Sequence, residues 1–354
     1  MATVKISQLI AAATPLTGTE EIPVVQSGTT VKATAQDIAD LVAPTIPTLQ
    51  QVLDNNHALA LGRNFQGIDA GLNITGPYIS NVNAFGSQAA RSLFASDVNA
   101  LGQLAANGNA GRYVNAFGTS TAVGNTAEDV NAMGTSAATQ NAGANVNALG
   151  INAATQNSGI NINAFGSQSA RSNTGDNVNA IGVSAAYQNT GSSVVAIGDN
   201  AAYQNTGDNL TATGKNAGYG NTADNANAFG ISAAQNNTGI NLSCFGESTA
   251  VGNTGSDLSA FGRAAGYGNT GDYVLALGRS AASSNGGSNV IALGLQSAMG
   301  NTLSNMTMIG NGCLSSYANH TAAAAAITVL AGGVSGNTYL YHNQATNSIG
   351  TVRL

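Results

Sequence analysis

Apolar and polar positions recur along most of this chain with a period of sixteen residues, without an insertion or a deletion. Every repeat contains one glycine that serves as its origin, so that position −1 is the residue before it and position +7 lies seven residues after it. Self-similarity at a fixed short period is typical of a repeat architecture, and a period this short suits one coil of a β-solenoid or β-roll rather than a pair of helices. The fifteen origin glycines are Gly86, Gly102, Gly118, Gly134, Gly150, Gly166, Gly182, Gly198, Gly214, Gly230, Gly246, Gly262, Gly278, Gly294 and Gly310.

The four residues before each glycine predict a β-strand that is apolar on both faces. Position −4 is always apolar and position −2 is usually alanine, as in Val178 and Ala180. Position −1 is large and apolar in fourteen of the fifteen repeats, with Thr213 as the exception. Because successive strand residues point to opposite faces, positions −4 and −2 share one face, and positions −3 and −1 share the other. We expect both faces to be buried, one inside the chain's own roll and the other against further copies in a parallel homotrimer.

The second half of each repeat predicts turns and ladders of asparagine. Position +3 is always small, position +7 is asparagine in every repeat from Asn109 to Asn301, and a glycine or alanine usually follows at +9. Asparagine and glycine are turn residues, and asparagines aligned up a stack can hydrogen-bond to one another. A second ladder is expected at position −3, from Asn83 to Asn179. The predicted fold class is all-β, a parallel β-roll or β-solenoid of fifteen repeats.

Both flanks of the array break the pattern. A hairpin is predicted around Ser27 and Gly28, and residues 34–37 resemble a capping box that opens a short helix. Residues 59–62 look like the start of a repeat, but Gly62 is out of phase with Gly86, so residues 58–77 are interpreted as an irregular cap. Four parts follow: a small α+β module at 1–45, a linker and N-terminal cap at 46–79, the array at 80–310, and a C-terminal cap or tip at 311–354.

The composition of the chain argues against some classes of binding partner. Only 7% of residues are charged and the net charge is −6, which argues against nucleic acid, because that partner requires clustered Lys and Arg. The longest apolar run, residues 322–331, is about half of the ~20 residues that a membrane-spanning helix needs. Residues 9–13 imitate a signal peptide but are short. We expect no membrane insertion. Cys244 and Cys313 occupy positions for small residues, and a disulfide framework is not expected.

No catalytic or metal-binding constellation is visible, so we expect neither an enzyme, nor a metal site, nor a cofactor. The three histidines, His57, His320 and His342, have no metal-ligand spacing. Acidic residues in the turn region are interpreted as solvated, although carboxylates paired across chains could bind a cation. They are Asp176, Asp208, Asp224, Asp257 and Asp272.

Aromatic residues supply the candidate binding sites. Tyr187, Tyr203 and Tyr219 share one repeat position in consecutive repeats, and Tyr267 returns to it. Such a column could stack on sugars of a host surface, or it could be a ladder that only stabilises the roll. The C-terminal part contains a second aromatic-rich set, which either touches the host or seals the last coil. Its members are Tyr317, His320, Tyr339, Tyr341 and His342.

Two resemblances indicate a function. Residues 194–198, 274–278 and 290–294 read V-V-A-I-G, V-L-A-L-G and V-I-A-L-G. They resemble the V-A-I-G core of trimeric autotransporter adhesin heads, which implies three chains in parallel β-rolls around one axis. That family's repeat is usually shorter, and its secretion signal and membrane anchor are not recognisable here.

The N-terminal part is similar to the openings of phage fibres and other phage structural proteins. The matching segments are residues 5–9, 16–20, 22–26, 30–32, 37–38 and 48–54. The likeness implies a fibre of the virion, made in the host cytoplasm, that docks through its N-terminus on another virion protein and presents a tip to a host glycan or protein. An exported adhesin on the bacterial surface is the alternative. A polysaccharide-degrading tailspike is a weaker one, because such enzymes usually need paired carboxylates.

Overall fold

The computed structural model describes residues 62–74 and 79–312 in full and, outside them, the backbone of five strands. The chain divides into two compact units, Met1–Arg63 and Asn64–Leu354. In the first unit, β1 (Glu21–Gln26) pairs antiparallel with β2 (Thr29–Thr34), and Gln26 lies opposite Thr29. This is the pairing that a two-residue hairpin loop at Ser27 and Gly28 produces. Thr34, the predicted start of a helix, is the last residue of β2, and the rest of that predicted helix and the linker after it lie outside the described residues.

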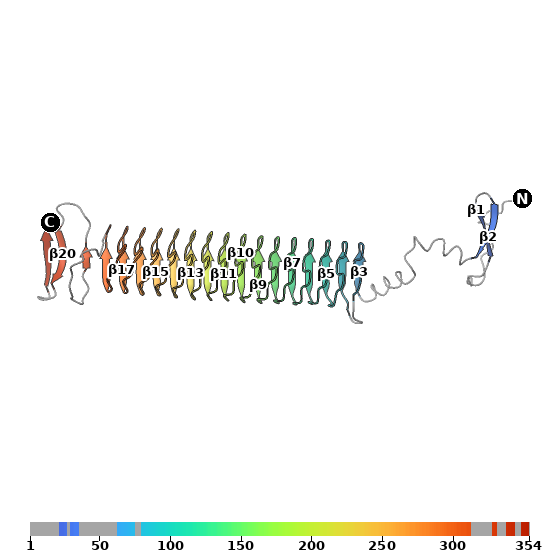
Figure 1. Ribbon diagram of the computed structural model, residues 1–354, viewed down its shortest axis with the longest axis horizontal. Helices are drawn as coiled ribbons and strands as arrows, with labels where there is room; N and C mark the ends of the chain where they lie inside the picture. Colours follow the sequence, from blue (N-terminus) through green and yellow to red (C-terminus); the bar gives the residue numbers. More distant parts are fainter. Residues whose placement is uncertain are drawn as a thin grey trace. The chain divides into compact units, whose positions relative to one another are not determined.

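The second unit is a stack of short parallel strands (Figure 1). The described residues contain no helix, and therefore none that is long and apolar enough to cross a membrane. The strands are β3 (Arg63–Gln66), β4 (Val82–Phe85), β5 (Val98–Leu101), β6 (Val114–Phe117), β7 (Val130–Met133), β8 (Val146–Leu149), β9 (Ile162–Phe165), β10 (Val178–Ile181), β11 (Val194–Ile197), β12 (Leu210–Thr213), β13 (Ala226–Phe229), β14 (Leu242–Phe245), β15 (Leu258–Phe261), β16 (Val274–Leu277), β17 (Val290–Leu293), β18 (Met306–Ile309) and β19 (Thr328–Leu330).

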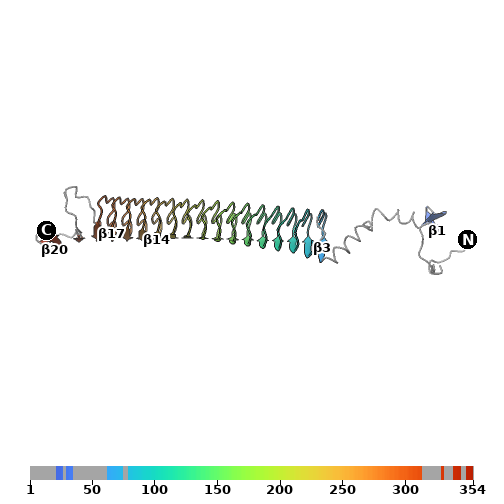
Figure 2. The same cartoon turned by 90° about the horizontal axis from the view of Figure 1, so that it is seen from below.

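Each strand from β4 to β17 pairs in parallel with the next, always against the equivalent residue of the following repeat. In β10 and β11, for example, Val178 lies opposite Val194 and Ala180 opposite Ala196. One repeat is therefore one coil, as the period predicts. The strands form a gradually twisting layer on one side of the stack, and the turn segments form the other side (Figure 2). Stacked strands lie about 4.8 Å apart, so fifteen coils make a rod of about 70 Å.

The two ends of the array depart from the sequence prediction. Residues 62–74 form an additional regular coil, whose origin glycine is Gly67 and not Gly62. Gly67 has the φ of 134° seen at Gly86, and the N–H of Gly86 donates to the carbonyl of Gln66. The sixteen-residue period does not reveal this coil in the sequence, because Gly67 and Gly86 are separated by three residues more than one period. At the other end, β19 adds one more parallel strand beside β18.

The origin glycines are required by the close stacking of coils. Gly198 has a φ of 133°, which L-residues rarely adopt. A Cβ built at Gly198 would lie 2.6 Å from the carbonyl oxygen of Gly214 in the next coil. The same collision recurs along the array, which explains why this position never varies.

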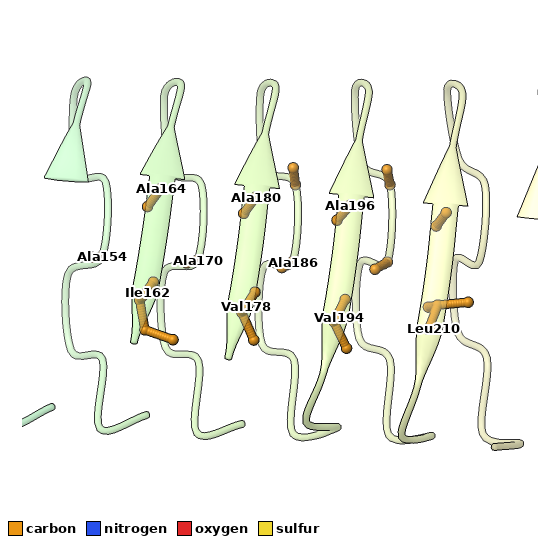
Figure 3. Close-up of a cluster of buried hydrophobic side chains, with 14 of the residues drawn as sticks. Ala154, Ile162, Ala164, Ala170, Val178, Ala180, Ala186, Val194, Ala196 and Leu210 are labelled. Carbon is orange, nitrogen blue, oxygen red and sulfur yellow. The ribbon is translucent and has the colours of Figure 1, made fainter. Parts of the chain in front are cut away.

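The core consists mainly of alanine and valine side chains, with a few leucines, and both layers contribute to it (Figure 3). Val178 and Ala180 of the strand layer meet Ala186, at position +4 of the turn layer, and all three are fully buried. Ala186 has a φ of 51°, in the left-handed region that costs about 1–2 kcal/mol for a non-glycine residue. Where position −4 is enlarged to Leu210, position +4 becomes Gly218, whose added Cβ would lie 2.9 Å from Leu210 Cδ2. In this coil the smaller residue of the turn layer makes room for the larger residue of the strand layer, although Leu242 is accommodated opposite Ala250 without such a change.

Buried asparagines at position +7 form the predicted ladder. The amide of Asn173, for example, donates 2.9 Å to Oδ1 of Asn157 in the preceding coil and 2.7 Å to the carbonyl of Gly175 in its own coil. The ladder continues without interruption from Asn109 to Asn301. The second predicted ladder, from Asn83 to Asn179, is also present, on the outer face of the strands.

Candidate interaction surfaces

The outer face of the sheet carries a column of large apolar side chains at position −1, from Phe85 to Ile309, interrupted only at Thr213. We call it the apolar stripe. Its members remain substantially exposed in the single chain, with Leu101 at 50% and Ile181 at 45%. Within it, the rings of Phe229, Phe245 and Phe261 stack at centroid distances of 4.7 and 5.1 Å. No repeat has a charged residue at position −3 or −1. Long uncharged apolar surfaces of this kind mark sites of interaction.

This arrangement shows which strand face is buried by the chain itself. Positions −4 and −2 point into the roll and are covered, whereas positions −3 and −1 point outward. The expectation that both faces are buried is therefore met on one face only within a single chain. Burial of the other face by further copies stays a prediction.

The predicted tyrosine column is a tight face-to-face stack. The ring centroids of Tyr187 and Tyr203 lie 4.9 Å apart, and those of Tyr203 and Tyr219 lie 5.0 Å apart, with nearly parallel planes. Arg171, one coil earlier, places its guanidinium carbon 5.8 Å from the centroid of Tyr187. Both faces of Tyr203 are thus occupied by its neighbours. A sugar ring has no free face of Tyr203 on which to stack, and binding at the ring edges and hydroxyls stays a prediction.

The central tyrosine of the column has an altered pKa. The pKa of Tyr203 is raised above its ordinary value, first by desolvation and then by the neighbouring hydroxyls of Tyr187 and Tyr219. A phenolate at the centre of the column would lose hydration and would repel charge on either side. Both effects favour the neutral hydroxyl of Tyr203 at the centre of the column.

The remaining predicted site residues do not join this column. Tyr267 lies in the same row but three coils beyond Tyr219, and it is exposed. Tyr339, Tyr341 and His342 share one strand, β20 (Thr338–Asn343), which pairs antiparallel with β21 (Ser348–Arg353). Tyr317 and His320 lie outside the described residues.

The acidic residues of the turn region have a structural role that the sequence did not reveal. Asp176 Oδ1 accepts a hydrogen bond of 2.9 Å from the backbone N–H of Ile160, and Asp208 Oδ1 accepts one of 2.7 Å from Ser192. Asp224 and Asp272 repeat this contact. Asp257, one position further along, accepts from the amide of Asn241. These carboxylates are consequently more than solvated turn residues, because they satisfy donors of the preceding coil.

Among the described residues, no group of three or more His, Cys, Asp or Glu side chains is placed to hold a metal ion. The five acidic residues named above lie in different coils and are engaged by backbone or amide donors. This geometry gives no support to a cation site within one chain. A site formed by carboxylates of several chains stays untested.

No family model, curated protein or solved structure matches this chain. Fold and surface alone define its class, which is that of the all-β parallel β-solenoid repeat proteins, with about fifteen coils of sixteen residues. Such a fold fits fibres, adhesins and tailspike-like proteins.

Proposed function

We propose that this protein is a structural and adhesive fibre of a phage particle, on its tail or its head. The observation that carries the proposal is the uniform rod with an uncharged apolar stripe that runs along its outer sheet face. A rod in which every coil is hydrogen-bonded to the next is stiff and keeps its two ends at a constant separation. A spacer between a particle and a cell requires this property. The N-terminal likeness to phage fibre openings, at residues 5–9 and 22–26, favours the virion over other settings.

In this proposal three copies lie parallel with their apolar stripes facing a common axis. The assembly would remove the exposed leucine, isoleucine and phenylalanine side chains of all three chains from water. Residues 1–45 dock on another virion protein, and residues 311–354 form the distal end. That end either contacts a host glycan or protein, or only closes the last coil.

An exported trimeric adhesin on the bacterial surface is the second candidate. The V-V-A-I-G segment at residues 194–198 favours it, because this resembles the core of adhesin heads. A tailspike that cleaves polysaccharide gains no support, since the described Asp176, Asp208, Asp224 and Asp272 form hydrogen bonds to neighbouring coils. Cleavage of glycosidic bonds usually requires two carboxyl groups that face each other across a groove.

Mass spectrometry of purified phage particles, with antibody labelling in the electron microscope, tests the proposal. We expect the full-length chain in stoichiometric amounts in particles, and label on thin projections. Its presence in the host envelope fraction and absence from particles would support the adhesin instead.

The distal end has a separate test. Deletion of residues 333–354 from the recombinant fibre should reduce adsorption to host cells if this end binds the host. Adsorption at the full-length level excludes that role, and loss of trimers alone identifies a cap.

A further inference from the structure

The outer face of the sheet becomes more apolar near the C-terminal end of the array. In β16 and β17 the outward side chains are apolar at both positions −3 and −1, namely Leu275, Leu277, Ile291 and Leu293. We call these four residues the C-terminal patch. Leu275 and Ile291 are 38% and 39% exposed, and Leu277 is 50% exposed. No other two consecutive repeats have apolar residues at both positions.

The four side chains form one surface because the strands are in register. Leu275 lies opposite Ile291, and Leu277 lies opposite Leu293. On the N-terminal side, Phe261 pairs with Leu277 and continues the apolar stripe toward the stacked rings of Phe245 and Phe229. The patch is thus the widest part of the stripe, two columns across instead of one.

The first seven coils present a different surface beside the stripe. There position −3 is asparagine, and each amide donates to the next, as from Asn147 to Asn163 at 2.9 Å. An apolar surface laid on this row would cover amide groups without offering them hydrogen bonds, which is unfavourable. The two ends of the sheet face are therefore not interchangeable, and an apolar partner is best accommodated at the C-terminal patch.

Three features identify the partner as another copy of this chain. The surface carries no charge that would select a charged partner. The patch continues into a stripe of about 70 Å, and only a partner with the same coil spacing can match a side chain to every coil. Finally, parallel copies in register place patch against patch and asparagine row against asparagine row, whereas antiparallel copies would set leucines against amides.

We infer that the C-terminal patch is the self-association site at which copies of this chain first join, in parallel and in register. The inference rests on the proposed fibre, since it names where the chains of that fibre hold together most strongly. Apolar burial per coil is greatest at β16 and β17, so contacts there retain two chains long enough for the narrower stripe to align.

The test uses the full-length chain with Leu275→Asn and Ile291→Asn. Asparagine is the residue that this chain itself has at position −3 in eight of the fifteen repeats, so the coil accommodates it and can form an amide pair there. The matched control is Val251→Thr with Met299→Thr. It removes two apolar side chains at position +5, on the turn layer, and threonine already stands at this position in Thr139 and Thr155.

Sedimentation equilibrium over a wide range of concentrations measures the dissociation constant, and circular dichroism checks that the coils remain folded. We expect the patch variant to associate at least ~100-fold more weakly than the wild type, about ten-fold for each buried side chain lost. The control should match the wild type.

The possible failures are distinguishable. Equal dissociation constants for the patch variant and the wild type overturn the inference but leave the trimeric fibre intact. Equal weakening in the control also overturns it, because the patch is then not special. A wild-type chain that stays monomeric at every concentration overturns both the inference and the proposed trimer.

Discussion

The side-chain amide of Asn189 donates a hydrogen bond of 2.8 Å to Oδ1 of Asn173 one coil earlier, and both side chains are fully buried. The second amide hydrogen of Asn189 reaches the carbonyl of Gly191 at 2.6 Å, while its own oxygen accepts from Asn205. Both donors and the acceptor of this buried group are therefore engaged. A buried polar ladder of this completeness favours one stacking register over its alternatives.

Removal of one rung should destabilise the whole rod. Asn189→Ala leaves Oδ1 of Asn173, an amide hydrogen of Asn205 and the carbonyl of Gly191 without their partner inside the core. We expect a loss of about 3–5 kcal/mol, measured as a lower Tm or denaturant midpoint. Asn179→Ala, on the exposed ladder, is the control and should cost about 1 kcal/mol or less. Equal losses of stability at the two positions would show that the buried +7 ladder stabilises the fold no more than the exposed ladder does.

The origin glycines should tolerate no side chain. Gly198→Ala would combine an unfavourable φ with a collision against the carbonyl of Gly214, and we expect a loss of about 3 kcal/mol or more. Gly252 is the matched control, because its φ is 62° and a Cβ there meets nothing within 4 Å. Gly252→Ala should cost only about 1 kcal/mol. Thermal unfolding of the two variants compares them, and a Gly198→Ala chain as stable as the control contradicts the proposed cause.

Enlargement of the inner strand face should disturb packing. Ala180 is fully buried between the two layers, so Ala180→Phe overpacks the coil and should cost at least ~1–3 kcal/mol per chain. The neighbouring change Ile181→Phe serves as the control, since position −1 points outward and already carries phenylalanine in other coils. A melting temperature unchanged by Ala180→Phe would refute the burial of this position.

Stability should decline in alkaline solution partly through Tyr203. Its pKa is raised in the folded chain, so once the pH exceeds the unfolded value of about 10, the unfolded state releases this proton more readily than the folded state. Stability is thus complete below that pH and falls as the pH rises toward the folded pKa. We expect Tyr203→Phe to reduce the alkaline decrease in Tm, with Tyr267→Phe as the control. Identical pH profiles for the two variants would exclude a role for the column.

Much of this architecture was predictable because a strict period leaves little freedom. Sixteen residues per repeat fixed the coil, the alternation before Gly198 fixed which positions share a face, and the columns of asparagine required partners one repeat away. The additional coil at Gly67 was not predicted, because its distance from Gly86 differs from the sixteen-residue period. Periodicity identifies a coil only where the spacing between repeats is constant.

The sequence by itself therefore determined the coil, its core and its ladders, since these are local consequences repeated at every turn. Only the tertiary structure decided three further points. The face with Leu277 is left exposed by the single chain, Asp176 satisfies a backbone donor of the preceding coil, and the rings around Tyr203 cover one another. The first depends on which face of the strands the turn layer covers, and the other two depend on distances between neighbouring coils. Both are set by the packing of the roll rather than by the order of residues along one strand.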